Sequence, residues 1–186
     1  QGIINKLDYL KELGFTALWL TPVVENNTFR SYHGYSSTDF YSVDARLGDN
    51  SLYKKMVEEA QKRGIKVILD HVANHFSKDH QWAKLLPHPG WVNGSFASPP
   101  PPVHHKQVFP DINSDSSTIK KVVEGWFTDY MPDFNQTNSF VANYITQNTI
   151  WWVEFAGLDG IREDTYPYNH EGYMAEWAKT IMEEYP

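Results

Sequence analysis

The strongest constraint on the fold is a pattern that occurs three times, in which a helical run ends at a glycine and a short apolar strand follows. The glycines of the three copies are Gly14, Gly64 and Gly157. Glycine commonly ends a helix because it adopts the left-handed backbone conformation without steric cost. Helices that alternate with buried strands predict an α/β protein with a parallel sheet, because parallel neighbours need a crossover connection.

The spacing of apolar residues sets the limits of the expected elements. Apolar residues recur every three or four positions, as in amphipathic helices, over residues 1–13, 51–63, 140–156 and 171–185. Short apolar runs at 15–20, 65–70 and 158–164 predict buried strands. Asn50 or Ser51 is expected to cap the second helix. Met174, Trp177 and Met182 are expected to face inward from the last helix.

Two long excursions, at 23–49 and 76–139, interrupt this pattern. The second contains four consecutive prolines at 99–102, which cannot join a sheet ladder and predict an extended segment. Large aromatic residues in the same excursion predict a small folded unit rather than a structureless loop. They are Trp82, Trp91, Phe96, Phe109, Trp126 and Phe127.

The composition excludes several classes of partner. A formal net charge of −7 does not suit binding to a nucleic-acid backbone or to an anionic membrane surface. The absence of cysteine excludes disulfide and thiolate chemistry. No apolar run approaches the length of a membrane span, and no signal peptide is visible. The compartment is left open, and the 15% of aromatic residues suit stacking on sugars or bases.

Polar residues stand where the expected strands end, which is where α/β proteins place their sites. Thr21, Asp70 and Asp164 occupy these ends, and no glycine-rich phosphate motif follows any strand. Arg162 and Asp164 are two residues apart and share one side of a strand. A guanidinium favours the ionised form of a carboxylate, as the nucleophile of a covalent glycosidase requires. A purely structural Arg–Asp pair is the alternative.

A second polar cluster runs from Asp70 to His75 and admits three interpretations. His75 could donate to a sugar hydroxyl while Asp70 accepts from one. His71 and His75 could bind zinc, although a spacing of four serves a metal only on a helix. The cluster could also be a satisfied polar turn. On the loop after the first strand, Tyr35 could stack on a sugar with His33 beside it, or both could simply pack there.

These motifs together resemble those of the α-amylase family of glycoside hydrolases, which are retaining α-glucan enzymes built on a (β/α)8 barrel. The matching motifs come in the order of the family. They are Gly14–Pro22, Tyr32–Tyr35, the set Asp70, Asn74 and His75, the run Met131–Asn135, and the set Gly160, Arg162 and Asp164. The runs Gly125–Phe127 and Arg162–Tyr168 are most similar to the cyclomaltodextrinase and neopullulanase branch.

The resemblance implies a partial TIM barrel with strands 2–4, their flanking helices and an inserted subdomain after strand 3. The expected division is 1–75 for the first part of the barrel, 76–139 for the inserted subdomain and 140–186 for the continuation. A complete barrel has eight strands and about 250 residues, so the chain is interpreted as a fragment. The family's general acid, a glutamate on strand 5, is expected beyond Pro186, in the remainder of the barrel or another subunit.

The resemblance also implies roles for individual residues. Asp164 would be the nucleophile and Arg162 would keep it ionised and aligned. Tyr35, His75, Asp70, His33 and Tyr168 would bind an α-glucan, a maltooligosaccharide or a cyclodextrin. Asn74 and Asp133 match positions that bind calcium in many members, while the chemistry itself needs no cofactor. One departure is Pro167–Tyr168, where many members have Lys-His and a usual substrate contact.

Two other classes of function remain as alternatives. One is a non-catalytic, amylase-like domain that binds carbohydrate or is associated with a transporter. Retention of Arg162 and Asp164 together with Tyr35 and His75 argues against it. The other is a half-barrel that serves as a structural or interaction module, since exposed strand edges favour pairing with another copy.

Overall fold

The computed structural model describes residues 1–28, 30–102 and 113–186, and its contacts divide these residues into two compact units. The first unit comprises Gln1–His71 and Asn148–Glu163. The second comprises Val72–Gln147 and Asp164–Pro186. Phe109 lies outside the described residues.

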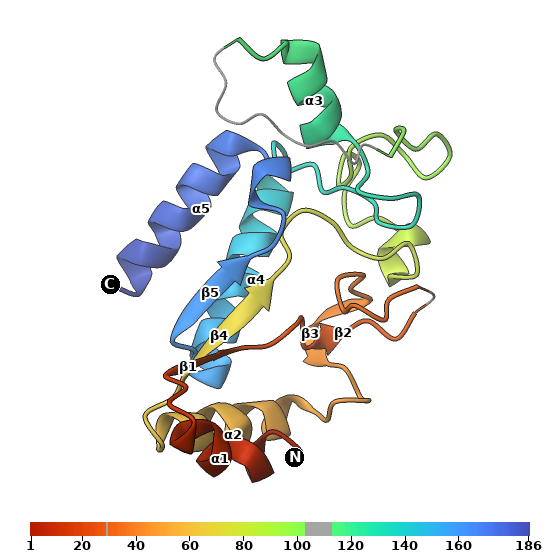
Figure 1. Ribbon diagram of the computed structural model, residues 1–186. Coiled ribbons are helices and arrows are strands. Elements are labelled where there is room, and N and C mark those ends of the chain that lie inside the picture. Colours follow the sequence, from red (N-terminus) through yellow and green to blue (C-terminus); the bar gives the residue numbers. More distant parts are fainter. Residues whose placement is uncertain (29, 103–112) are drawn as a thin grey trace. The chain divides into compact units, whose positions relative to one another are not determined.

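A three-stranded parallel sheet forms the framework of the first unit (Figure 1). Its order is β1–β4–β5, with β1 at Ala17–Trp19, β4 at Lys66–His71 and β5 at Gly160–Glu163. The register pairs Leu18 with Val67 and Asp70 with Arg162. The expected parallel sheet and its three strands are therefore confirmed, although β1 and β5 are shorter than the apolar runs that predict them and β4 is shifted by one residue.

Helices connect the strands in the predicted order. The 3-10 turn η1 at Ile4–Lys6 and helix α1 at Leu7–Glu12 precede β1, and helix α2 at Asn50–Gln61 precedes β4. Helix α4, at Ser139–Ala156, precedes β5, and its second half belongs to the first unit. Gly14, Gly64 and Gly157 follow these helices with φ of 87°, 75° and 69°, as their predicted role requires.

The cap of α2 differs from the prediction. Asp49, rather than Asn50 or Ser51, caps this helix, because its side chain accepts a hydrogen bond from the backbone N–H of Leu52. Asn50 instead uses its side chain to hold strand β3 (Asp39–Val43), since its Oδ1 accepts from the N–H of Val43 and its Nδ2 donates to the carbonyl of Tyr41.

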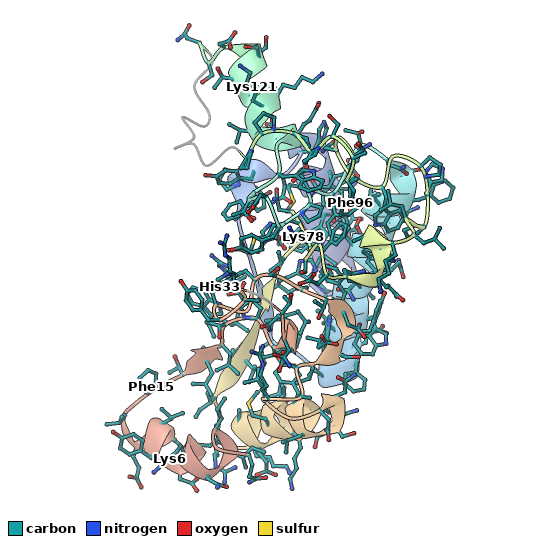
Figure 2. The ribbon with its side chains drawn as sticks, turned by 90° about the vertical axis from the view of Figure 1, so that its right-hand side faces the viewer. Lys6, Phe15, His33, Lys78, Phe96 and Lys121 are labelled. Atoms are coloured by element: carbon teal, nitrogen blue, oxygen red, sulfur yellow. The ribbon has the colours of Figure 1, made fainter. Side chains whose placement is uncertain are left out.

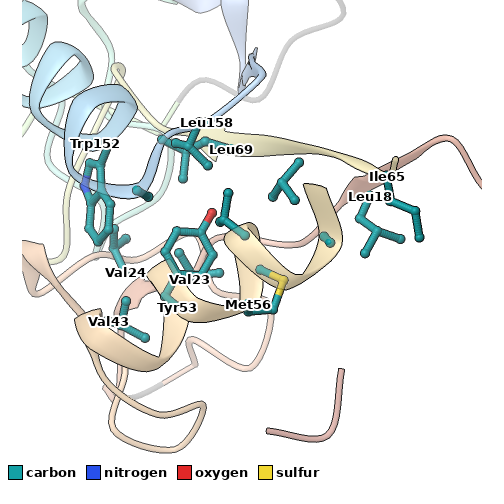
Figure 3. Close-up of a cluster of buried hydrophobic side chains, with 14 of the residues drawn as sticks. Leu18, Val23, Val24, Val43, Tyr53, Met56, Ile65, Leu69, Trp152 and Leu158 are labelled. Carbon is teal, nitrogen blue, oxygen red and sulfur yellow. The ribbon is translucent and has the colours of Figure 1, made fainter. Parts of the chain in front are cut away.

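The first unit contains one element that the apolar pattern did not indicate. Strands β2 at Val24–Glu25 and β3 at Asp39–Val43 form an antiparallel pair inside the first excursion. Residues from this pair, from the sheet and from the helices form a single buried cluster (Figure 3). Tyr53 and Trp152 meet edge to face within it, with ring centroids 5.8 Å apart. Burial of these aromatic and aliphatic groups is the main contribution to the stability of the unit.

The second unit is built on aromatic packing rather than on a sheet. Its elements are the 3-10 turn η2 at Gln81–Ala83, helix α3 at Ser116–Glu124, the first half of α4, the turn η3 at Tyr166–Tyr168 and helix α5 at Glu171–Glu184. Phe76 packs against Trp82, Phe134 and Phe96, the last of which is labelled in Figure 2. The expectation that the aromatic residues of the excursion form a folded unit is confirmed for those that the structure describes.

Helix α5 differs from expectation on one side. Met174 and Trp177 are buried as predicted, but Met182 is 72% exposed near the end of the helix. The four prolines at 99–102 belong to neither a helix nor a strand, and their extended conformation stays a prediction. Within the described residues, no helix combines the length and the apolar character that crossing a membrane would require.

Candidate active site

Asp70 lies at the C-terminal end of β4, and its buried carboxylate accepts hydrogen bonds from three side chains of the first unit. Trp19 Nε1 and the Tyr35 hydroxyl each donate to Oδ2 over 2.9 Å. Arg162 donates from a terminal guanidinium nitrogen to Oδ1 over 2.8 Å. The register of the sheet explains the last contact, because Asp70 and Arg162 are direct partners in β4 and β5. One carboxylate thus fixes an indole, a phenol and a guanidinium.

The guanidinium of Arg162 also lies over two aromatic rings. Its central carbon is 5.1 Å from the ring centroid of Trp19 and 5.9 Å from that of Tyr35. Cation–π attraction therefore adds to the ion pair with Asp70. Trp19 is 55% exposed and the side chain of Arg162 is 35% exposed, while the side chain of Asp70 is fully buried, so the indole and the guanidinium form the accessible part of this group.

The loop that carries Tyr35 is shaped by His33 and by a glycine. His33 Nδ1 accepts from the backbone N–H of Tyr35 over 3.0 Å, and the two rings are 5.8 Å apart. Gly34 has a φ of 94°, and a side chain there would lie 3.1 Å from the carbonyl oxygen of Pro22. Only glycine fits at position 34 beside Pro22, and the hydroxyl of the next residue, Tyr35, reaches Asp70. The structure brings His33, Tyr35, Asp70 and Arg162 together, and their role as a site stays a prediction.

His71, the next residue on β4, contacts a carboxylate and a hydroxyl in the interior of the first unit. Its Nδ1 is 2.5 Å from Glu163 Oε2, and its Nε2 is 3.0 Å from the hydroxyl of Thr149. The three groups are aligned like a nucleophile–histidine–carboxylate triad. However, the Thr149 residue is fully buried in helix α4, so no substrate reaches its hydroxyl.

This arrangement overturns the zinc interpretation. His71 lies on a strand rather than on a helix, and both of its ring nitrogens are engaged by Glu163 and Thr149. Within residues 1–28, 30–102 and 113–186, no three His, Cys, Asp or Glu side chains are grouped as metal ligands.

In the second unit, Asn74 and Asp133 lie on neighbouring segments. The backbone N–H of Phe134 donates to the Asn74 carbonyl over 2.9 Å, and His75 and Asp133 form a β-bridge. The carboxyl group of Asp133 is buried, and this burial raises its pKa well above the usual value, although Asn93 Nδ2 donates to it over 2.7 Å. Asn74 Oδ1 is buried and has no hydrogen-bond partner in the described part of the chain.

These two oxygens fit a hard cation. An orphaned amide oxygen and a buried carboxylate are ligands that calcium takes, and a bound cation would reverse the effect of burial on the Asp133 carboxyl. The chemistry of these two donors suits the calcium that the sequence motifs imply, and its binding by Asn74 and Asp133 stays a prediction.

His75 and Tyr168 are joined through a residue that sequence reasoning did not assign to a site. The buried His75 ring is stacked on Phe127, with centroids 5.0 Å apart and planes inclined by 16°. Tyr168 meets the same Phe127 edge to face at 5.5 Å. The sequence signals for Phe127 were the excess of aromatic residues in the excursion and the family-like run Gly125–Phe127, and neither assigned it a contact. A contact of His75 or Tyr168 with a sugar stays a prediction.

Asp164 follows β5 directly and is 8% exposed. The next residue, Thr165, has φ 47° and ψ 35°, a left-handed conformation that β-branched residues rarely adopt. The ion pair that the structure gives for Arg162 is with Asp70, which the sequence analysis did not foresee. The predicted alignment of Asp164 by Arg162 stays a prediction.

Comparisons with known proteins agree with the motifs. A family model described as alpha amylase, catalytic domain, matches residues 1–181. A beta/alpha-amylase of Paenibacillus polymyxa is 34% identical over 181 residues, which cover 95% of this chain and 14% of that protein. An intracellular maltogenic amylase of Bacillus subtilis is 32% identical over 187 residues, covering 100% of this chain and 29% of that protein.

Solved structures show the same likeness. The alpha-amylase of Geobacillus thermoleovorans, crystallised with acarbose, has a TM-score of 0.80 at 36% identity, covering 98% of this chain and 37% of the other. A cyclomaltodextrinase has a TM-score of 0.74 at 22% identity, covering 99% and 30%, and shows the fold alone. The chain spans well under half the length of these relatives, and its sheet and helices are part of a (β/α)8 barrel. The chain belongs to the alpha-amylase catalytic-domain family of glycoside hydrolases.

Proposed function

We propose that this chain supplies the nucleophilic half of a retaining α-glucan hydrolase, with Asp164 as the nucleophile. The observation that carries the proposal is the group around Asp70, in which three side chains are fixed at the C-terminal ends of the strands. This edge is where barrel enzymes assemble their sites. Membership of a family whose named relatives are amylases supports the same reaction class.

In the proposed reaction, a carboxylate oxygen of Asp164 attacks the anomeric carbon of the sugar. The glycosidic bond breaks, and its electron pair leaves with the departing oxygen, which a carboxylic acid protonates. Water, activated by the same group, then releases the covalently bound sugar. Retaining enzymes need two carboxyl groups about 5–5.5 Å apart. The second is proposed to come from residues outside this chain, on another part of the barrel.

The group around Asp70 would prepare the binding surface rather than react. Because Asp70 is buried and already accepts three hydrogen bonds, its role is to orient Tyr35 and Arg162. Tyr35, with its hydroxyl anchored, would offer its ring for stacking on the sugar. Positioning of this kind lowers the barrier by holding the reactants in a reactive geometry.

The remaining residues have supporting roles in the proposal. His33 and Tyr168 would contact an α-glucan, a maltooligosaccharide or a cyclodextrin, while the fully buried His75 would support this surface through its stacking on Phe127. Calcium held by Asn74 and Asp133 would supply the partner that Asn74 Oδ1 lacks and would offset the cost of burying the Asp133 carboxylate, and it would stabilise the second unit without entering the chemistry.

A substrate whose leaving group needs no proton tests the nucleophile in the absence of the general acid. α-Glucosyl fluoride meets this need, because fluoride departs with its electron pair as an Asp164 oxygen bonds to the anomeric carbon. The chain should then gain one glucosyl group, located on Asp164 by mass spectrometry of its peptides. Asp164→Asn is the matched control and should gain none.

The outcomes separate the alternatives. A label on the wild-type chain that is absent from Asp164→Asn supports the assignment. A folded chain that binds maltooligosaccharide but never acquires the label supports a non-catalytic carbohydrate-binding domain and refutes the assignment. A label at another carboxylate would transfer the role of nucleophile to that residue.

A further inference from the structure

We propose that Gln136 and Asn169 are positioning residues for the reaction, forming a buried amide clamp that holds the turn at Thr165 and thereby the carboxylate of Asp164. All four residues lie in the second unit. The inference rests on the proposed function, because it assumes that Asp164 is the nucleophile. It deepens that function, because it names the residues that fix Asp164 through the segment that follows it in the chain.

The turn needs to be held because Thr165 is unfavourable there in two respects. Its φ of 47° and ψ of 35° place a β-branched residue in the left-handed region, where the Cβ atom crowds the backbone. Its hydroxyl is buried and finds no hydrogen-bond partner among the residues that the structure describes. A conformation of this kind persists only when surrounding contacts enforce it, and such residues cluster at active sites.

Asn169 is the first part of the clamp. Its Nδ2 donates to the carbonyl oxygen of Thr165 over 2.9 Å, and the backbone N–H of Tyr168 donates to the same oxygen over 2.8 Å. Asn169 is 3% exposed, so water does not compete for these bonds. The carbonyl of the strained residue is thus held from two directions.

Gln136 is the second part, and every hydrogen-bonding group of its side chain is used. Its Nε2 donates to Asn169 Oδ1 over 2.5 Å and to the carbonyl of Ala73 over 2.8 Å. Its Oε1 accepts from the backbone N–H of His170 over 2.7 Å. A primary amide has two N–H donors and one oxygen, so no smaller or apolar side chain could replace this set.

The position of the clamp links the two polar segments of the second unit. Ala73 lies next to Asn74, in the segment that follows β4, while Asn169 and His170 follow β5. Gln136 therefore fixes the distance between these segments from within the interior, where it is only 6% exposed. Neither amide is assigned a contact with the sugar. Their effect on the reaction must therefore pass through the placement of Asp164.

The test measures the rate at which α-glucosyl fluoride labels Asp164. In Gln136→Leu the rate at saturating reagent should fall by about 10–100-fold, the range typical when hydrogen bonds that orient a functional group are lost. The half-saturating concentration should change less than about threefold, because the binding groups are retained. Asn138→Leu is the matched control, since Asn138 is an amide of the same unit whose side chain bonds to Gly90, His88 and the N–H of Phe140 rather than to the turn. It should label at the wild-type rate.

A rescue experiment separates positioning from loss of packing. Glycine adopts the left-handed conformation freely, so Thr165→Gly removes the strain that the clamp opposes. In that background Gln136→Leu should lose less than about tenfold in rate. Gln136→Leu with Asn169→Leu should label no more slowly than the slower single variant, because the two amides act as one network. If Gln136→Leu fails to fold, Gln136→Glu carries the test, since it keeps the shape and the acceptor but not the donors.

Each outcome decides one point. A wild-type chain that is folded and unlabelled overturns the proposed function. A labelled wild type together with a folded Gln136→Leu or Gln136→Glu that labels equally fast overturns the clamp alone. Additive losses in the double variant, or no rescue by Thr165→Gly, show that Gln136 serves general packing and also overturn the clamp.

Discussion

Replacing Glu163 by leucine should destabilise the first unit far more than replacing Glu163 and His71 together. The two side chains are 4% and 5% exposed, and they meet at 2.5 Å. Removal of Glu163 takes away the carboxylate that meets Nδ1 of the buried His71 imidazole, whichever tautomer His71 adopts. The other nitrogen keeps Thr149, whose hydroxyl can donate or accept.

The magnitudes follow from what each variant leaves buried. An unpaired buried polar group costs about 1–3 kcal/mol, so Glu163→Leu should cost about 2 kcal/mol. His71→Leu leaves a buried carboxylate and should cost about 3–5 kcal/mol. The double variant leaves only the Thr149 hydroxyl, which can bond to the carbonyl four residues earlier in α4, and it should lie within about 1 kcal/mol of wild type.

Urea unfolding followed by far-ultraviolet circular dichroism measures these differences. Lys120→Leu is the control, because its ion pair with Glu124 is long, at 3.8 Å, and exposed, so the midpoint should not move measurably. The reasoning is refuted if Glu163→Leu unfolds at the wild-type midpoint. It is equally refuted if the losses of the two single variants simply add in the double variant.

Two further predictions concern carboxylates. Hydrogen bonds from Arg46 are the main cause that lowers the pKa of Asp44 to about 2. The ionised carboxylate therefore stabilises the fold fully above its ordinary pKa near 3.8, and this stabilisation is lost as the pH falls through about 2. Asp44→Asn should therefore cost about 2 kcal/mol at pH 7 and almost nothing at pH 2, by urea unfolding; an equal loss at both pH values would contradict this. Calcium should raise the melting temperature of the chain, measured by calorimetry, and Asp133→Asn should abolish this rise. An equal rise in Asp133→Asn would show that the ion binds elsewhere.

The framework of the first unit could be predicted because its signals are local. Apolar spacing and the glycines at 14, 64 and 157 indicate helix, turn and strand within a few residues of where the structure has them. The pairing of β2 with β3 could not be predicted in this way. It joins Val24 to Val43 across an excursion, and β2 is only two residues long, too short for an alternating pattern.

The site was predictable in its members but not in its contacts. Strand ends and motifs indicate Asp70, Arg162 and Tyr35, yet the partner of Arg162 follows from the register between β4 and β5. Spacing along one strand says nothing about register between strands, which is why Asp70 was missed as the partner. Gln136 and Thr165 were missed for a similar reason, because a backbone angle and a hydrogen bond over 33 residues leave no local pattern.

The glycines that precede β4 and β5 are constrained by backbone angle and not by space. Gly64 and Gly157 have φ of 75° and 69°, yet a side chain built at either position would meet nothing within 4 Å. Substitution at Gly64 and Gly157 is therefore limited to residues that tolerate the left-handed conformation. Asparagine and aspartate should substitute at modest cost, and valine or isoleucine should not. Positions 64 and 157 can thus gain a polar side chain, and with it a new surface contact, without a change in the backbone that connects the helix to the strand.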